Sequence, residues 1–363
     1  MRIGQIIEVL EQWAPPELQE SYDNSGLIVG NTNWESSGVL VALDCLESVV
    51  DEAIAKNINL IVAHHPIVFS GLKRFNGRSY IERVVMKAIK HDVAIYAIHT
   101  NLDNVLWGVN AKVMEVLGIS DYEILSPMND ALKKFEVYVP TEHVAVLEQA
   151  IFKAGGGKVS AYEECSFRSD GTGSFKGTSG TQPAIGEVDK REFVQEAKLE
   201  FIVPAYAASA VERAARAAHP YEEMAYQWLS VGNTSTHFGA GAVGNLPGEL
   251  GFEGFLKRVK SIFGTTIRYT ASAGNVVKKV AVCGGSGSFL LSAAMAAEAD
   301  VFITADYKYH QFFDADGKIS ILDVGHFESE QFTIDLIADF IEKNFPKFAV
   351  LKTKVNTNPI QYY

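Results

Sequence analysis

The chain has 363 residues, of which 47% are apolar and 21% are charged, and its formal net charge is −12. This composition excludes a chain that is disordered over most of its length. Because the acidic charge is spread evenly and no basic stripe occurs, it also argues against nucleic acid as a main partner. The length exceeds twice the ~150 residues of a typical domain, so we expect two or three domains.

Segments of two kinds alternate from residue 1 to about residue 128. Apolar residues at helical spacing predict a first helix that stops at Pro15-Pro16. Short runs of Val, Ile, Leu and Ala then predict strands at 38–44, 59–65 and 93–99. Helix-like stretches separate these strands, and this rhythm indicates a largely parallel sheet covered by helices.

The middle segment, about 129–240, contains an internal repeat. Residues 133–155 align with 197–219, and each copy reads as a strand, a turn containing proline and an amphipathic helix. Two such units in tandem predict an inserted ferredoxin-like α+β domain. Between them, residues 169–186 are rich in Gly, Ser and Thr, which predicts a long loop or a hairpin; phosphate binding is the alternative interpretation.

The strand–helix rhythm returns near the end of the chain. Helices are predicted at about 288–298 and 328–343, between or after strands at 278–283, 300–304 and 319–324. The predicted fold class is therefore α/β, with two similar α/β regions on either side of the inserted domain.

Cysteine usage and the first residues of the chain bear on its compartment. Cys45, Cys165 and Cys283 lie far apart and form no CxxC pair, which argues against a disulfide framework and against a zinc site made of cysteines. Glu8 and Glu11 stand where a signal peptide needs an apolar run, and no stretch reaches the ~18 apolar residues of a membrane span. We expect a cytoplasmic protein without a membrane partner.

Side chains that bind metals follow three of the predicted strands. His64 and His65 follow the strand at 59–65, and Asp103 follows the strand at 93–99, where an Asx turn or a helix cap is the alternative role. If a helix begins after the strand at 319–324, His326 and Glu330 share one of its faces at i, i+4 spacing.

Together these side chains predict a centre with two metal ions. Three imidazoles and two carboxylates exceed the needs of one tetrahedral zinc, but they suit two divalent ions bridged by a carboxylate and water. Zn, Mn, Fe and Co all accept this donor set.

Other residues near these strand ends have open roles. Asp44 and Asp306 are candidates to orient ligand imidazoles, or they form turns and caps. His99 and His310 are candidate proton shuttles. The loop Gly284–Ser288 either holds a phosphate or allows tight packing of a strand on a helix.

Six ordered motifs resemble the NIF-three-like family, whose members are homologues of GTP cyclohydrolase 1 type 2. The motifs are DNSGL (23–27), VALD (41–44), AHHP (63–66), HTNLD (99–103), ITAD followed by YH (303–310) and GHFESE (325–330). They cover both flanking regions. Longer bacterial members of the family carry a central insert that is similar to the PII and CutA proteins.

This resemblance implies a dinuclear metal-binding core made of residues 1–128 and 241–363, with a PII/CutA-like domain at 129–240. It implies metal ligands at the five positions found above, which are His64, His65, Asp103, His326 and Glu330. It also implies a toroidal homohexamer in which the metal sites face an internal cavity.

The sequence thus favours a metal-dependent hydrolase in which a metal-bridging hydroxide attacks carbon or phosphorus. A small molecule is the expected substrate, and a purine nucleotide or a phosphoester is what the family name implies. The alternative is a metal-binding regulatory or assembly protein without catalysis, whose PII-like insert senses a small ligand. No Gly-rich nucleotide fingerprint occurs, which keeps this alternative open.

Overall fold

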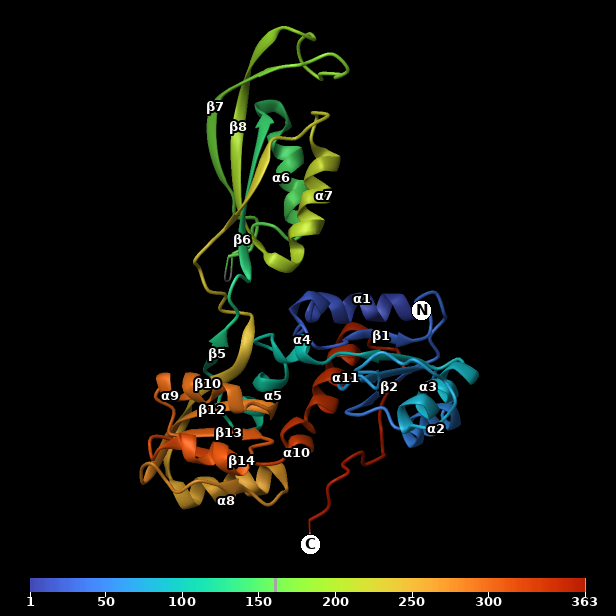
Figure 1. The fold of residues 1–363 in the computed structure, drawn as a ribbon, viewed down its shortest axis with the longest axis vertical. Helices are drawn as coiled ribbons and strands as arrows, with labels where there is room; N and C mark the ends of the chain where they lie inside the picture. The colour runs from blue at the N-terminus through green and yellow to red at the C-terminus, as the bar shows by residue number, and fades with distance from the viewer. Residues whose placement is uncertain (160–161, 363) are drawn as a thin grey trace. The chain divides into compact units, whose positions relative to one another are not determined.

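The structure is a computed structural model that describes residues 1–159 and 162–362 (Figure 1). By their contacts the described residues form two compact units. One consists of Met1–Pro127 with His237–Tyr363, and the other is Met128–Thr236. Among the described residues, no helix is both long and apolar enough to cross a membrane. All three cysteines are free thiols, as expected, and Cys45 and Cys283 are buried.

A five-stranded sheet in the first unit has the order β1-β4-β3-β2-β15. Its strands are β1 (Gly26–Val29), β2 (Val39–Ala42), β3 (Leu60–Ala63), β4 (Ala94–Ala97) and β15 (Val350–Lys352). All neighbours are parallel except β1 and β4. Every residue of β2, β3 and β4 is buried, which is why these strands read as continuous apolar runs in the sequence. The three strand predictions in this region are confirmed.

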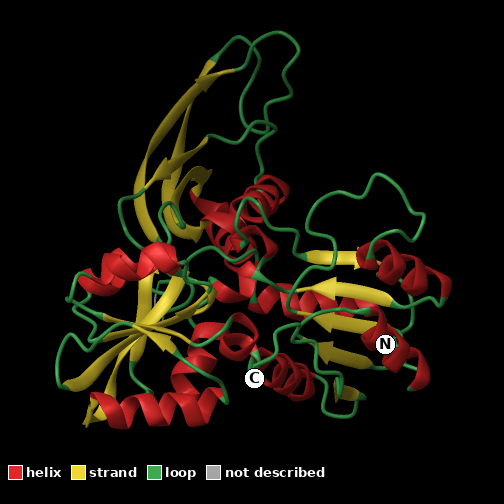
Figure 2. Ribbon diagram, turned by 60° about the horizontal axis from the view of Figure 1, so that its bottom comes forward, coloured by secondary structure: helices red, strands yellow, loops and turns green. Residues whose placement is uncertain are grey.

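Helices cover this sheet on its faces and at its strand ends (Figure 2). They are α1 (Ile3–Trp13), η1 (Pro16–Leu18), α2 (Glu47–Ala55), α3 (Tyr80–Lys90), α4 (Thr100–Asp103) and α11 (Thr333–Asn344), whereas α5 (Val109–Val116) packs on the other sheet of this unit. Helices α2 and α3 share one apolar cluster with the sheet. The side chain of Ser79 accepts a hydrogen bond from the backbone N–H of Glu82 and so caps the start of α3.

A six-stranded sheet in the same unit has the order β11-β14-β13-β12-β10-β5. Its strands are β5 (Tyr122–Pro127), β10 (Gly239–Gly251), β11 (Arg268–Tyr269), β12 (Val276–Ser286), β13 (Val301–Ala305) and β14 (Ser320–Asp323). Strands β12, β13 and β14 are parallel, as the sequence predicts, and the other pairs are antiparallel.

Apolar side chains alternate between the two faces of this sheet. Val280 and Val282 pack in a cluster with α8 (Phe252–Phe263) and α5, whereas Ala281 and Cys283 pack on the other face with α9 (Leu291–Ala296). Two short 3₁₀ segments, η4 (Ser288–Leu290) and η5 (Tyr309–Ala315), follow β12 and β13.

The single helix predicted at about 328–343 is wrong, because the structure divides it into α10 (His326–Glu330) and α11. The side chain of Gln331 donates hydrogen bonds to the carbonyls of Phe263 and Glu328. The ring of Phe332 packs edge-on against Phe263 at 5.7 Å. Gln331 and Phe332 thus both contact Phe263 of α8 at the point where the helix is interrupted, and nothing in the local sequence marks this break.

The second unit has a sheet of order β7-β8-β6-β9, in which every pair is antiparallel. In chain order its elements are β6 (Leu132–Pro140), η2 (Thr141–His143), α6 (Val144–Lys153), β7 (Phe167–Lys176), β8 (Arg191–Pro204), η3 (Ala205–Ala207), α7 (Ala208–Ala218) and β9 (Tyr226–Ser230). The two repeated segments each form a strand, a turn after proline and a helix. The Gly/Ser/Thr-rich stretch starts inside β7, which forms a hairpin with β8.

Candidate metal centre

Four histidine rings gather where strands of the two sheets in the first unit end. His64 and His65 follow β3, His99 follows β4, and His326 begins α10 after β14. The ring centroids of His64 and His65 are 5.0 Å apart, those of His64 and His99 are 5.2 Å apart, and those of His65 and His326 are 5.3 Å apart. The carboxyl ends of both sheets therefore supply one cluster.

Each of these rings is hydrogen-bonded at Nδ1 to a group behind it. The partners are the carbonyl of Ile98 for His64 (2.8 Å), Asp44 for His65 (2.8 Å), Asp306 for His326 (2.7 Å) and Asp23 for His99 (2.7 Å). A ring held at Nδ1 keeps its Nε2 atom for the cluster, which is how proteins orient histidine ligands. Asp44 and Asp306 thus make the orienting contacts that the sequence suggested, and Asp23 adds one that it did not.

The carboxylate of Glu330 lies between two sets of donor atoms. Its Oε2 atom is 2.9 Å from Nε2 of His65 and 3.2 Å from Nε2 of His326. Its Oε1 atom is 3.9 Å from Nε2 of His64. One carboxylate therefore reaches imidazoles that follow strands of both sheets.

Two buried polar atoms in the cluster lack a hydrogen-bond partner among the described residues. They are Nε2 of His64 and Oδ1 of Asp103, which are 3.7 Å apart. Leaving such atoms unpaired is costly. An ion about 2.0–2.2 Å from each ligand would fit in this gap and would satisfy both atoms. These residues fit a metal ion.

In each of two groups of three residues, the donor atoms lie within 4.8 Å of one another. One is His64, His65 and His99, and the other is His65, His326 and Glu330. His99, which the sequence proposed as a proton shuttle, is therefore also close enough to be a ligand. Asp103 belongs to neither triplet, and its contact with the cluster is the one to His64.

Burial and paired charges set the pKa values of the cluster. Burial lowers the pKa of His64 to about 3. Burial also acts to lower the pKa of His65 and His326, but hydrogen bonds to Glu330 and to the orienting carboxylates raise these values to about 10 and about 11. Burial, together with the charge of Glu330, raises the pKa of Asp103 well above its usual value. Without metal, His65 and His326 are therefore protonated at neutral pH, whereas His64 is neutral.

The loop Gly284–Ser288 serves the packing of Glu330. Gly285 has φ +62°, and a Cβ atom there would come within 2.3 Å of Oε1 of Glu330. The N–H of Gly284 donates to Asn110 and that of Gly285 donates to Ser329. Because these donors already have protein partners, the structure favours the packing role over the phosphate-binding role.

His310 is not brought into the cluster. It lies exposed on η5, and its ring contacts are with Tyr309 and Phe313. Nothing within the described residues links its ring to the four histidines, so the structure does not support its role as a shuttle.

A segment after β15 contacts two carboxylates that lie behind the histidine cluster. The Thr357 hydroxyl donates to Oδ2 of Asp44 at 2.6 Å, and the Asn358 side chain donates to Oε1 of Glu328 at 2.9 Å. Asp44 follows β2 in one sheet, and Glu328 lies on α10 next to the other sheet. The sequence did not predict a role for this segment, because no local sequence pattern indicates either contact.

Comparisons with known proteins agree over the length of the chain. The sequence model of the family described as Duf34/NIF3 (NGG1p interacting factor 3) matches residues 1–359. The chain is 39% identical over 365 residues to the GTP cyclohydrolase 1 type 2 homolog of Bacillus subtilis, covering 99% of this chain and 98% of the relative. It is 41% identical over 325 residues to that of Halalkalibacterium halodurans, covering 88% and 87%.

A solved structure is also similar. The Bacillus cereus protein related to NIF3 matches with a TM-score of 0.83 and 33% identity, covering 100% of this chain and 99% of that one.

We expect binding of Zn²⁺ to the metal-free protein at pH 8 to release protons, about two of them from His65 and His326, because the ion must displace the protons that these residues hold. Apparent affinity should fall as the pH is lowered. Calorimetric titrations in two buffers of different ionisation enthalpy count the protons. Glu330→Gln removes the carboxylate that His65 and His326 share, so it should reduce the number of protons released. A heat of binding that is the same in both buffers would contradict the prediction.

Thr357→Val should weaken Zn²⁺ binding by about tenfold, because Asp44 loses the hydroxyl that helps it to hold His65. Thr357→Ser keeps that hydroxyl and should bind as the wild type does. Competition with a chromophoric chelator measures the affinities. Equal affinity in all three proteins would show that the contact does not act on the site.

Proposed function

The chain belongs to the Duf34/NIF3 family, and we propose that it is a divalent-metal-dependent hydrolase with ligands His64, His65, Asp103, His326 and Glu330. Family membership confirms the resemblance found in the sequence. The observation that carries the proposed site is the pair of buried, unpartnered atoms on His64 and Asp103, because a cation is the partner that satisfies both.

Two ions per subunit are supported by the position of Glu330, whose two oxygens face different imidazoles. Two divalent ions bring four positive charges, and Asp103 and Glu330 offset two of them. The carboxylates of Asp23, Asp44 and Asp306 lie one imidazole further out and bring three more negative charges, which exceed the two that remain. Zn, Mn, Fe or Co suits this mixture of nitrogen and oxygen donors.

The proposed chemistry divides between the metal and the protein. When bound, divalent ions lower the pKa of water to about 7 and so supply hydroxide at neutral pH. Asp44 and Asp306 keep Nε2 of His65 and His326 directed at the cluster. His99 is held by the buried Asp23, which also accepts hydrogen bonds from the backbone and hydroxyl of Thr100. Nε2 of His99 is thereby placed to accept or return a proton beside the proposed ligands.

A ligand-sensing regulator is the second candidate, and the middle unit favours it. We propose that this unit is a ferredoxin-like, PII/CutA-like insert, supported by its β-α-β-β-α-β order and its own apolar core. It contains a cavity of about 290 Å³ lined in part by Phe175, Glu196 and Tyr221, large enough for a small molecule. The toroidal homohexamer stays a proposal that rests on the family resemblance.

We expect Asp103→Asn to lower metal-dependent turnover at least about a hundredfold and to reduce the metal content. The assays are elemental analysis of protein purified without chelator, and turnover of GTP and a panel of phosphoesters with added Zn²⁺ or Mn²⁺. Glu253→Gln, at an exposed position on α8, is the matched control and should behave as the wild type.

The outcomes separate the two candidates. Full metal content without turnover of any substrate would favour the regulator. Wild-type protein that takes up no metal would contradict both.

Removing residues 129–236 should leave the metal stoichiometry unchanged. Pro127 and Gly239 are paired across β5 and β10, so a short turn can close the gap. Elemental analysis and circular dichroism of the shortened protein provide the test. Loss of metal from a protein that is still folded would refute the modular interpretation.

A further inference from the structure

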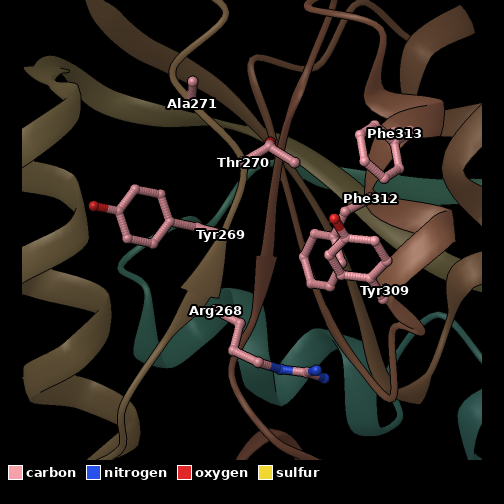
Figure 3. A pocket seen from close by; sticks show the side chains of 7 residues that line it. All are labelled: Arg268, Tyr269, Thr270, Ala271, Tyr309, Phe312 and Phe313. Atoms are coloured by element: carbon pink, nitrogen blue, oxygen red, sulfur yellow. The ribbon is translucent and has the colours of Figure 1, made fainter.

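A second pocket lies at the carboxyl edge of the six-stranded sheet (Figure 3). It has a volume of about 340 Å³ and is open to solvent. Its lining comes from β11 with the two residues after it and from η5, namely Arg268, Tyr269, Thr270, Ala271, Tyr309, Phe312 and Phe313. Four of these seven residues are aromatic and one is a cation, which is an unusual combination for an exposed surface.

The pocket is connected to the candidate metal centre by short stretches of chain. Asp306 holds the ring of His326, and Tyr309 is only three residues further along. Consecutive Cα atoms are about 3.8 Å apart, so the Cα atoms of these two residues are separated by no more than about 11 Å. Asp306 itself has φ +59°, a strained conformation for a residue with a side chain, at the point where the chain leaves β13 for the pocket.

The aromatic rings are presented to solvent rather than packed away. Tyr309 is 72% exposed and Phe313 is 66% exposed, and their ring centroids are 5.5 Å apart in an edge-to-face arrangement. In Figure 3 the ring of Tyr309 overlaps that of Phe312. Rings held in fixed places beside a cavity offer faces on which a planar ligand can stack.

Arg268 supplies the polar part of the pocket. Its Nη2 atom donates to the carbonyl of Tyr307 at 3.1 Å and to the carboxylate of Asp323, and its Cζ atom lies 5.5 Å from the centre of the Phe312 ring. Within the described residues, both hydrogen bonds of the Arg268 side chain use the same nitrogen, Nη2. The Nε and Nη1 donors are therefore left for a ligand, and a guanidinium group fits a phosphate well.

Asp323 ties this arginine to the metal centre. The backbone N–H groups of Tyr307 and Gly325 donate to its carboxylate at 3.0 and 3.1 Å. Gly325 directly precedes His326, the first residue of α10. A group bound by Arg268 therefore lies next to the strand end from which a candidate metal ligand starts.

We propose that this pocket binds a planar aromatic compound that carries a phosphate, with the ring stacked on Tyr309 and the phosphate on Arg268. If the protein is the hydrolase proposed above, this compound represents the class of its substrate. Binding of the compound does not itself depend on hydrolysis. The rings and the guanidinium belong to the protein itself, so binding does not require metal.

The test uses the full chain after removal of metal with EDTA, and 1-naphthyl phosphate as the probe. Calorimetry and ligand-observed NMR compare it with its two parts, 1-naphthol and inorganic phosphate. We expect the whole probe to bind at least about tenfold more tightly than either part, because stacking and charge pairing both contribute.

Matched variants assign the two contacts. Tyr309→Ala should weaken naphthyl phosphate and naphthol by about tenfold but leave inorganic phosphate unchanged, whereas Tyr309→Phe should retain binding. Arg268→Gln should weaken naphthyl phosphate and inorganic phosphate but leave naphthol unchanged. Tyr309 is 72% exposed, so its variants should fold as the wild type does. Arg268 pairs with the buried Asp323, so circular dichroism and a thermal melt establish first that Arg268→Gln is folded.

Three results would overturn the proposal. The first is an affinity for naphthyl phosphate that neither variant changes, since the phosphate would then bind elsewhere, for instance at the protonated histidines. The second is that Tyr309→Ala changes the mass of the protein's oligomer in solution but not its affinity for naphthyl phosphate. The rings would then belong to a contact between copies of the chain. The third is no binding at all. Because metal-free protein is used, none of these results depends on whether the hydrolase exists.

Discussion

A buried carboxylate is the constraint around which the first unit is organised. The side chain of Glu330 is 4% exposed, and burial of a lone carboxylate is far more costly than any single contact in the fold. It is tolerated because imidazoles from β3 and from its own helix surround it, and because Gly285 leaves room for its oxygen. Both sheets must therefore be correctly placed before this group is satisfied, which couples their docking to the formation of the site.

Much of the site could be predicted because its signals are local. Strands buried on both faces appear as continuous apolar runs, and chemistry-bearing residues at their carboxyl ends fall at one edge of a sheet. His64, His65 and the i, i+4 pair of His326 and Glu330 were visible for this reason. The resemblance to a family further predicted that the first and last parts of the chain together form one core.

The features that were missed depend on contacts between distant residues. β10 is rich in glycine and does not read as an apolar run, so neither it nor its partner β5 was predicted. Asp23 holds His99 across 76 positions, and Thr357 holds Asp44 across 313. A hydrogen bond at such a separation has no periodicity to detect. The aromatic pocket likewise joins β11 to η5, which are about 40 residues apart.

The position of Glu330 near the end of the chain has a consequence for biosynthesis. This residue follows His65 by 265 positions. At the usual elongation rate of about 5–20 residues per second, roughly 13–53 s pass between the synthesis of the two. During that interval the five-stranded sheet is already encoded up to β4, and its histidines stand without their shared acid. The nascent chain therefore carries His64 and His65 without Glu330 for most of its translation, and the complete cluster can form only after the second half of the protein has emerged.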